Sequence, residues 1–523
     1  KGKARSNKAI VGGGSVANVY GGIATENGGE ATENKAEIYG GTVTNVYGGA
    51  VDKVDAAATK NKVQVRGGTV TGEIAGAHAV YDTTLTATHT LSNGNNVMLG
   101  SEEPTRALGM NVAGASIYGT DYRDVTPSVT GTPELTFDSA SDQIKDNKLI
   151  VTTTGVSAKK VRNFDSYTFV LGDNFENKDT MLTLTEAGGF GTVSNVASNP
   201  AVKVDWGKVK ANTSKLTDRR GGGIHGRNNF TLMQEAVPGT TISYPNELAF
   251  ANYTDTAGIA EIDRVYEKKM TADVAPAAGS TDTSANKVLL ELNRFRNDEV
   301  THKGTEAQTP SEVYGGYSGY DHTEKVSGVL TTLGTTTESN ILNIEGIANG
   351  TTLKAYGGYT GGAHGGSKDN TVHINLEELP GNVASGDLDS VYGGYAEGAN
   401  AGAVSGNIVT FSQGATLHDL MGGYLKSTTS TSDVSGNKVF IAGGAFNNAV
   451  ATDSAPRIYG GATDGSGTAT RNVLQITGGT IGNATHVADV IGGRSATGAA
   501  VENHVVLGAA EPGATPTAPT LKG

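Results

Sequence analysis

The chain contains no cysteine and little proline: its 523 residues include 13 prolines and one tryptophan. Without cysteine it can form no disulfide, no zinc–thiolate site and no cysteine nucleophile. The scarcity of proline also argues against a disordered linker as the main body of the chain, although glycine is abundant at 75 residues. These glycines do not follow the every-third-residue period of collagen, which excludes that class.

Positive charge and long apolar runs are also lacking. Lys and Arg total 40 against 53 Asp and Glu, which gives a formal net charge of −13. We expect no nucleic-acid partner, because phosphate binding needs a concentrated basic surface. No run reaches the ~18 apolar residues of a spanning helix, so no membrane span is expected. The sequence starts at Lys1 without a visible signal peptide, and we expect it to be a processed part of a longer protein.

What the sequence has instead is a long-period repeat. A motif of one aliphatic residue, one aromatic residue and two glycines recurs along the chain, as in EVYGGYS (312–318), KAYGGYT (354–360) and SVYGGYA (390–396). An asparagine followed by alternating apolar residues precedes the motif, most clearly in NKAEIYGGTVTNVYGG (34–49). Intervals of roughly 30–40 residues with variable length are typical of stacked repeats that carry loops on one face.

The alternation after each asparagine predicts a short strand with Val and Ile on one side. Such short strands are stable only if each pairs with its equivalent in the next unit. The sequence therefore predicts an all-β fold, an elongated right-handed parallel β-helix (β-solenoid). The inward Val and Ile form its core, and the middle segment is β-rich but less regular.

Each part of the Tyr-Gly-Gly motif can be given a structural role. The two glycines are expected at a sharp corner with positive φ, where a side chain would clash. In the first unit quoted, Val313 is expected in the core and Tyr314 is expected to stack on its equivalents. The tyrosines assigned to these repeat corners are Tyr20, Tyr47, Tyr314, Tyr356, Tyr392 and Tyr459.

The recurrent asparagine is expected at a turn, where its amide bonds backbone groups and forms a ladder with its neighbours. An alternative is a row of amides that grips sugar hydroxyls, but turn bonding is the usual role of such residues. The positions are Asn34, Asn61, Asn147, Asn286, Asn340, Asn370, Asn407, Asn437 and Asn472.

Four segments are predicted from the distribution of the repeat. Residues 1–120 and 311–507 carry it, as N-terminal and C-terminal β-solenoid repeats. Residues 121–310 lack the Tyr-Gly-Gly motif but keep strand-like runs, so they are either degenerate solenoid or an inserted β-rich segment. Within them, 258–270 could be a short helix or a strand. Residues 508–523 are expected to be a Pro/Thr/Ala linker.

The repeats, together with VRNFDSYTFVLGDNFENKDTMLTLT (161–185), resemble the passenger region of autotransporter-type (type V secreted) surface proteins of Gram-negative anaerobic bacteria. The resemblance covers about the first quarter and the last two fifths of the chain, with part of the middle. It implies a β-helical passenger at the outer cell surface or in the extracellular space, often with an adhesive role.

One basic cluster stands out in this acidic chain. Arg219, Arg220, His225 and Arg227 lie close in sequence, with the only tryptophan, Trp206, nearby. They are interpreted either as a binding patch for anionic glycans or another partner, or as a solvated loop. The glycines of GGGIHG (221–226) match a dinucleotide fingerprint in spacing, but no strand precedes them and no helix follows.

No other chemical motif emerges. The ten histidines form no H-E-x-x-H pair, and there is no G-x-S-x-G nucleophile elbow. We therefore expect no cofactor, no metal site and no catalytic residues. The main hypothesis is an extracellular structural or adhesive surface protein, a stalk whose variable loops contact host or bacterial surface molecules, glycans among them. One alternative is a fibre subunit that stacks end to end, and a second is a polysaccharide lyase or glycosidase on the same scaffold.

Overall fold

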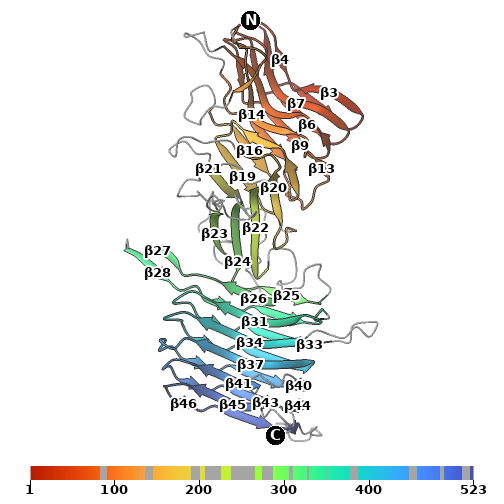
Figure 1. Cartoon of the computed structure of the whole chain (residues 1–523). Helices are drawn as coiled ribbons and strands as arrows, with labels where there is room; N and C mark the ends of the chain where they lie inside the picture. The colour runs from red at the N-terminus through yellow and green to blue at the C-terminus, as the bar shows by residue number, and fades with distance from the viewer. Residues whose placement is uncertain are drawn as a thin grey trace.

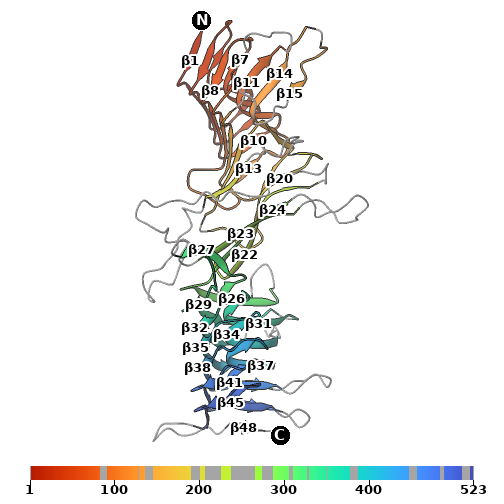
Figure 2. The same cartoon turned by 90° about the vertical axis from the view of Figure 1, so that its left-hand side faces the viewer.

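The computed structural model describes residues 2–82, 91–127, 129–135, 145–172, 174–189, 201–205, 225–236, 266–273, 287–304, 310–326, 329–348, 350–376, 387–446, 456–482, 488–508 and 519–521. Every regular element in these residues is a β-strand, so the prediction of an all-β protein is confirmed for them. The molecule is elongated, with its termini at opposite ends (Figures 1 and 2). In the described part of the chain, no helix is present that could cross a membrane.

The C-terminal coil consists of three parallel sheets that the chain visits in turn, and each passage through them is one rung. The short sheet contains β29 (Thr337–Glu338), β32 (Ser367–Lys368), β35 (Val404–Ser405), β38 (Val434–Ser435), β42 (Ala469–Thr470) and β46 (Ala500–Val501). The Asn sheet contains β25 (Glu299–His302), β30 (Ile341–Ile344), β33 (Thr371–Asn375), β36 (Ile408–Gln413), β39 (Lys438–Ile441), β43 (Val473–Ile476) and β47 (His504–Leu507). The Tyr sheet contains the Gly-Gly motifs, in β26 (Glu312–Ser318), β31 (Thr352–Thr360), β34 (Asp387–Glu397), β37 (Ala415–Lys426), β41 (Arg457–Thr463) and β45 (Asp489–Ser495).

The coil carries two additions. The short strands β40 (Ala445–Phe446), β44 (Thr480–Ile481) and β48 (Thr520–Leu521) continue its Tyr sheet in parallel pairing. The strands β27 (His322–Val326) and β28 (Val329–Leu333) form an antiparallel hairpin that projects from the first rung (Figure 1). Because β48 is paired, residues 520–521 of the predicted 508–523 linker belong to the coil, while 509–518 lie outside the described residues.

The N-terminal coil repeats the same plan. Its short sheet contains β1 (Lys3–Arg5), β5 (Glu30–Thr32) and β8 (Ala57–Thr59). Its Asn sheet contains β2 (Lys8–Val11), β6 (Lys35–Ile38), β9 (Lys62–Val65), β12 (Asn96–Leu99), β16 (Lys148–Val151), β19 (Ser166–Val170) and β21 (Ala201–Asp205). Its Tyr sheet contains β3 (Ser15–Tyr20), β4 (Ile23–Ala24), β7 (Thr42–Val51), β10 (Gly68–Val70), β11 (Glu73–Tyr81), β13 (Met110–Asn111), β14 (Ser116–Asp124), β15 (Glu134–Leu135) and β18 (Lys160–Arg162).

The core lies between the sheets and follows the predicted alternation. In β30, Leu342 and Ile344 are buried while the residues between and before them are partly exposed. Val372 and Ile374 repeat this pattern in β33, directly opposite in register. The alternating residues of successive rungs thus form a continuous apolar column, which is the expected source of stability for such short strands.

A buried asparagine ladder joins the rungs, as predicted. The Oδ1 atom of Asn407 accepts hydrogen bonds from the backbone N and the Nδ2 of Asn370, at 3.0 and 2.9 Å. Asn407 in turn donates from N and Nδ2 to Oδ1 of Asn437, at 3.1 and 2.9 Å, and its Nδ2 also reaches the carbonyl of Ser367. Of the predicted positions only Asn286 lies outside the described residues; Asn7, Asn95 and Asn503 also belong to the ladder.

The corner with positive φ lies immediately before this asparagine, and its placement at Gly-Gly was wrong. In the C-terminal coil the left-handed residues include Ser339 (φ 56°), Asp369 (φ 52°) and Glu502 (φ 56°). Gly315 and Gly316 lie inside strand β26 and have no positive φ. One left-handed residue, whether glycine or not, is therefore enough to turn the chain from the short sheet into the Asn sheet.

The Gly-Gly pair is required by close packing inside the strand. A Cβ atom on Gly394 would lie 2.3 Å from Nδ2 of Asn407 in the ladder, and one on Gly393 would lie 2.5 Å from the carbonyl oxygen of Gly422 in the next rung. The same two contacts recur at the Gly-Gly pairs of β7, β26, β31, β37 and β41, whereas β11 and β14 carry Ala77 and Thr120 at the second position. Glycine is thus needed because a neighbouring rung and the buried amide occupy the space of a side chain.

The middle segment combines both alternatives that the sequence left open. β16, β19 and β21 continue the N-terminal Asn sheet, and the apolar core is continuous from Val11 to Leu292. Beside them, β17 (Val156–Ala158), β20 (Thr180–Leu184), β22 (Arg227–Glu235), β24 (Lys287–Arg294) and β23 (Tyr266–Asp273) form a sheet that ends in antiparallel pairs. Residues 266–270 are thus strand, whereas 258–265 lie outside the described residues.

Polar groups join this middle sheet to the first rung of the C-terminal coil. Glu267 of β23 is buried and accepts hydrogen bonds from the Gly319 backbone N and the Ser318 hydroxyl, both at the end of β26. Asp298 takes the first position of the asparagine ladder and donates its backbone N to Asn340 at 3.0 Å. The apolar cores on the two sides form separate clusters, so this junction is held largely by hydrogen bonds.

Candidate functional site: the tyrosine face of the C-terminal coil

The outer surface of the C-terminal Tyr sheet bears two columns of tyrosines, which we call the Tyr face. A normal strand would place residues three apart on opposite sides. Tyr314 and Tyr317 nevertheless share a side, with ring centroids 4.8 Å apart, because the intervening Gly-Gly pair breaks the alternation. The inner column is Tyr314, Tyr356, Tyr392, Met421, Tyr459 and Ile491; the outer column is Tyr317, Tyr359, Tyr395, Tyr424, Ala462 and Arg494.

Rings within each column stack face to face, as predicted. Tyr314 and Tyr356 are 5.2 Å apart with 13° between their planes, and Tyr356 and Tyr392 are 5.3 Å apart. In the outer column Tyr359 lies 5.1 Å from Tyr317 and 5.3 Å from Tyr395, whereas the Tyr424 ring stands edge-on to Tyr395 and stacks instead on Tyr392 at 5.9 Å. Mutual stacking covers the ring faces, so mainly the ring edges and hydroxyl groups face outward.

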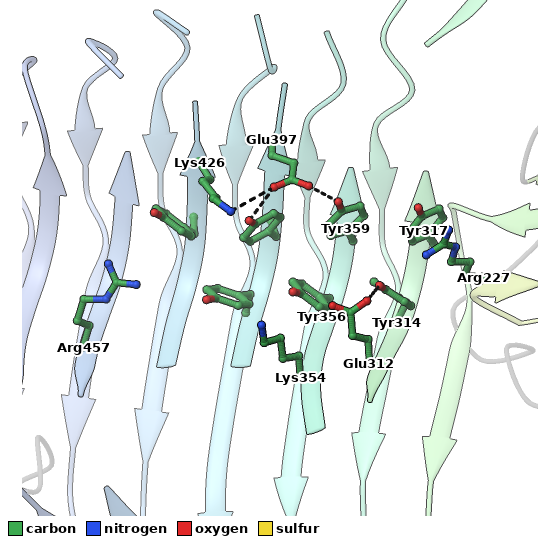
Figure 3. A pocket seen from close by; sticks show the side chains of 13 residues that line it. Arg227, Glu312, Tyr314, Tyr317, Lys354, Tyr356, Tyr359, Glu397, Lys426 and Arg457 are labelled. Carbon is green, nitrogen blue, oxygen red and sulfur yellow. Dashed lines mark hydrogen bonds and ion pairs between the residues drawn. The ribbon is translucent and has the colours of Figure 1, made fainter. Parts of the chain in front are cut away.

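Carboxylates accept hydrogen bonds from the hydroxyl groups (Figure 3). Glu397 accepts from both Tyr359 and Tyr395, the latter at 3.0 Å. Asp419 accepts from Tyr392 at 2.8 Å. In the same way Glu312 accepts from Tyr314, and Asp464 accepts from Tyr424 at 2.7 Å.

Each cation on the face lies beside a carboxylate of its own. Arg457 forms a two-pronged pair with Asp419, at 2.6 and 2.7 Å. Lys426 Nζ is 3.6 Å from Glu397, and Lys354 Nζ is 3.5 Å from Asp389. The charges of the face are therefore compensated locally.

Burial raises the pKa of the tyrosine hydroxyls. The pKa of Tyr317 is raised to about 12 by burial, although the Arg227 charge opposes the rise. The pKa values of Tyr392 and Tyr395 are raised further, by burial and by the neighbouring Asp419 and Glu397 carboxylates. These hydroxyls therefore stay protonated at ordinary pH and act as hydrogen-bond donors.

The face includes a shallow hollow of about 330 Å³. Its lining runs from Arg227 beside Tyr317, across the rungs of β26, β31, β34 and β37, to Arg457 of β41 (Figure 3). Hydroxyls, carboxylates and paired cations at such a surface suit recognition of a hydroxyl-rich ligand rather than an apolar one. Among the described residues, no group of three His, Asp or Glu side chains is placed to hold a metal ion.

The predicted basic cluster is only partly within the described residues, which exclude Trp206, Arg219 and Arg220. His225 and Arg227 are described, and both contact the junction with the C-terminal coil. His225 Nδ1 lies 2.6 Å from Asp298 Oδ1, and the Arg227 guanidinium lies over the Tyr317 ring at 4.8 Å. Both side chains remain partly exposed, at 34% and 42%, and the binding patch stays a prediction.

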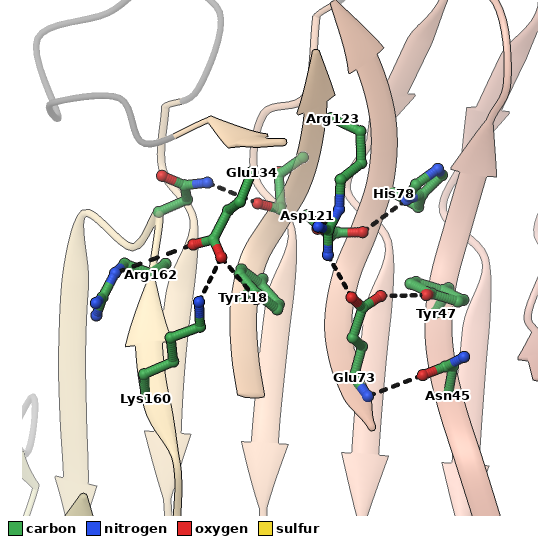
Figure 4. A network of polar contacts seen from close by, with 12 residues as sticks. Asn45, Tyr47, Glu73, His78, Tyr118, Asp121, Arg123, Glu134, Lys160 and Arg162 are labelled. Carbon is green, nitrogen blue, oxygen red and sulfur yellow. Dashed lines mark hydrogen bonds and ion pairs between the residues drawn. The ribbon is translucent and has the colours of Figure 1, made fainter. Parts of the chain in front are cut away.

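The N-terminal Tyr sheet carries a different polar network (Figure 4). Tyr20 stacks on Tyr47 at 5.2 Å, and Tyr47 donates its hydroxyl to Glu73. Arg123 pairs with both Glu73 and Asp121. Burial raises the pKa of Glu73, and the nearby Asp121 charge raises it further.

The outer column and its acids were not identified as site residues from the sequence. The signal was present in EVYGGYS and its copies, where a second tyrosine follows Gly-Gly. Two of the acids also lie close to a tyrosine in sequence: Glu312 lies two residues before Tyr314, and Glu397 lies two residues after Tyr395. Because the repeat was interpreted as a corner, this second tyrosine was not expected to face the same way as the first.

The fold and the face together define a class, an elongated all-β coil of parallel strands with an aromatic, charge-compensated surface. No protein-family model, no curated protein and no solved structure matches the chain. Any functional assignment therefore depends on the geometry of the coil and its face.

Proposed function

We propose that the chain is an extracellular structural and adhesive surface protein whose Tyr face contacts a partner on a cell or in the matrix. The supporting observation is the outer tyrosine column. In the N-terminal coil the register-equivalent positions are Ile23, Ala50, His78 and Asp121. That coil has the same frame, by which we mean the three parallel sheets and the buried asparagine ladder. Since the frame does not need an outer tyrosine column, its presence in the C-terminal coil favours a role in recognition.

The remaining parts of the proposal concern the coil itself. We propose that it is a right-handed parallel β-helix, because crossover connections between parallel strands are right-handed in the great majority of proteins. The resemblance of the repeats supports a passenger region of an autotransporter-type surface protein, located outside the cell. Stacked rungs form a stalk suited to presenting a face to host or bacterial surface molecules, glycans among them.

An adhesion assay tests this function. Purified chain is incubated with immobilised bacterial cells, host cells and extracellular matrix, beside the double variant Tyr359→Phe/Tyr395→Phe. The variant keeps both stacked rings but removes both hydroxyl groups from Glu397. We expect the wild-type chain to bind at least one of these surfaces and the variant to bind clearly less. Absence of binding to all of them would refute the proposal.

A second candidate function is self-assembly into an extracellular fibre. The outermost described rungs expose apolar side chains: Ile10 is 58% exposed, Val505 43% and Leu507 52%. Open sheet edges with such residues favour pairing with another chain. Electron microscopy across a concentration series distinguishes the candidates, because isolated rods of constant length at all concentrations argue against the fibre.

A further inference from the structure

The Tyr face repeats at a regular distance along the coil, and this repeat indicates the chemistry of its ligand. We propose that the face binds an extended, uncharged β-1,4-linked polysaccharide, laid along the coil axis with one sugar to each rung. This inference rests on the proposed adhesive function and names the class of molecule that the face recognises.

The spacing of the tyrosine rings supports this ligand. From β26 to β34, consecutive rings are 5.1 and 5.3 Å apart in the outer column, and 5.2 and 5.3 Å apart in the inner column. A ligand that places one unit at each rung must advance by about this distance per unit, as the sugars of an extended β-1,4-linked chain nearly do. An extended peptide advances about 3.3 Å per residue and a stacked nucleotide strand about 3.4 Å per nucleotide, so neither places one unit at each rung.

The charge balance of the face favours an uncharged ligand. Lys354, Lys426 and Arg457 each lie beside a carboxylate, at 3.5, 3.6 and 2.6 Å. An anionic glycan would have to break these pairs and approach their carboxylates, which repel it. An uncharged ligand leaves the pairs intact, so the charge pattern favours neutral sugars.

The exposed polar groups of the face can form hydrogen bonds with sugar hydroxyl groups. Glu397 already accepts tyrosine hydroxyls, but its side chain is 36% exposed and has further lone pairs that can accept sugar hydroxyl groups. Lys354 and Lys426 are about half exposed and can donate to sugar oxygens. Donors and acceptors therefore lie side by side at the hollow, as a polyhydroxylated chain requires.

The extent of the face sets the expected length of the ligand. At one end the Arg227 guanidinium covers the Tyr317 ring. At the other, Tyr424 is followed in register by Ala462, which ends the outer column of tyrosines. The column thus spans four rungs, and one sugar per rung predicts a tetrasaccharide as the shortest ligand that fills it.

A titration with oligosaccharides of defined length tests the inference. Isothermal calorimetry would use β-1,4-linked glucose and N-acetylglucosamine oligomers of two, four and six sugars, with α-1,4-linked maltohexaose as the control. We expect affinity to rise about tenfold or more from two to four sugars, about 1.4 kcal/mol, and to change little from four to six. Tyr359→Phe/Tyr395→Phe should weaken tetrasaccharide binding about tenfold, whereas Tyr20→Phe/Tyr118→Phe in the N-terminal coil should leave it unchanged.

The outcomes separate this inference from the proposed function. Binding of no β-1,4-linked oligomer, equal binding of maltohexaose, or equal binding by both Phe variants would overturn the polysaccharide inference. If the oligomers fail while the chain still adheres to cells or matrix through Tyr359 and Tyr395, adhesion stands and its ligand belongs to another class. Failure of adhesion as well would refute both.

Discussion

The two coils of this protein share one frame but carry different faces. Both have the buried asparagine ladder and place a left-handed residue before each asparagine, and in most rungs of both a glycine lies against the asparagine amide. On the Tyr sheet, the inner column of the N-terminal coil is interrupted at Ala75, between Tyr47 and Tyr118, and charged groups join its strands (Figure 4). In the C-terminal coil two tyrosine columns run in parallel (Figure 3).

This difference shows which residues hold the coil together and which are free to vary. The inner ladder asparagines are buried in both coils, and the first glycine of each pair lies against the backbone of the next rung in both, whereas Ala77 and Thr120 replace the second glycine in two N-terminal rungs. The outer column can hold isoleucine, alanine, histidine, aspartate or tyrosine without changing the pairing of the strands. The frame therefore separates stability from recognition, and substitutions in each part should have different effects.

Removing a ladder asparagine should reduce stability more than any of the other changes proposed, and by the same amount in both coils. In Asn407→Ala, two donors of Asn370 and the carbonyl of Ser367 lose their partner, and each buried unsatisfied group costs about 1 kcal/mol or more. We expect a loss of about 3 kcal/mol, and the same for Asn61→Ala. Hydrogen exchange of the backbone amides in the flanking Asn-sheet strands measures this loss of stability in each variant.

The exposed Asn400 supplies the control, since Asn400→Ala should leave exchange unchanged. A large loss in one coil with almost none in the other would show that the ladder is not a shared frame.

Adding a methyl group at the second glycine of a Gly-Gly pair should cause the next largest loss of stability. The Cβ of Gly394→Ala would lie 2.3 Å from the Asn407 amide, and that of Gly49→Ala 2.5 Å from the Asn61 side chain. Overpacking of this kind costs about 2–3 kcal/mol. Thermal unfolding should show comparable losses for both. Gly13→Ala, where nothing lies within 4 Å, should be neutral, and equal losses at all three sites would contradict the packing argument.

The alternating apolar residues and the asparagines were enough to predict the parallel strands, because burial on one face and turn bonding both act locally in sequence. The corner was misplaced because its true position is taken by residues as different as Ser339, Asp369 and Gly406, which share φ but no side-chain chemistry. The need for glycine within the strand could not be predicted from the strand's own sequence, because it arises from contact with the side-chain amide of a ladder asparagine elsewhere in the chain.

The face was harder to predict than the frame. That Tyr314 and Tyr317 share a side depends on the break in alternation at Gly-Gly, which strand periodicity alone would not give. The basic cluster was predicted from sequence proximity, yet His225 and Arg227 contact partners that lie far along the chain, Asp298 and Tyr317. Such long-range pairing is fixed by topology and is absent from any local pattern.

The junction between the two coils should respond to pH. Burial raises the pKa of Glu267 to about 7, above its ordinary value of 4.5, so the folded junction binds a proton that the unfolded chain releases. Its stability is therefore fully present below about pH 4.5 and is lost as the pH rises through 7. Since one pKa unit is about 1.4 kcal/mol, we expect a loss of about 2 kcal/mol between pH 5 and pH 8.

One other junction group acts in the same direction, since the Asp298 carboxylate raises the pKa of His225 against the opposing effect of burial. Hydrogen exchange of β23 and β26 at the two pH values checks the prediction. In Glu267→Gln the difference should shrink, while in Glu345→Gln, on the exposed surface, it should persist. A wild-type junction that is more stable at pH 8 would reverse the sign and refute the assignment.

The smallest effect on stability should come from the Tyr face itself. Tyr359→Phe/Tyr395→Phe keeps both stacked rings and removes two hydrogen bonds to Glu397, which still has Lys426 3.6 Å away. Each such hydrogen bond contributes about 1 kcal/mol at most, and less where water can replace it. We expect a loss of about 1 kcal/mol in urea unfolding, similar to Tyr47→Phe in the N-terminal coil. A loss of 3 kcal/mol or more would make the columns part of the frame. The difference between the coils would then be structural, because tyrosines that the coil needs for folding give no separate argument for a ligand.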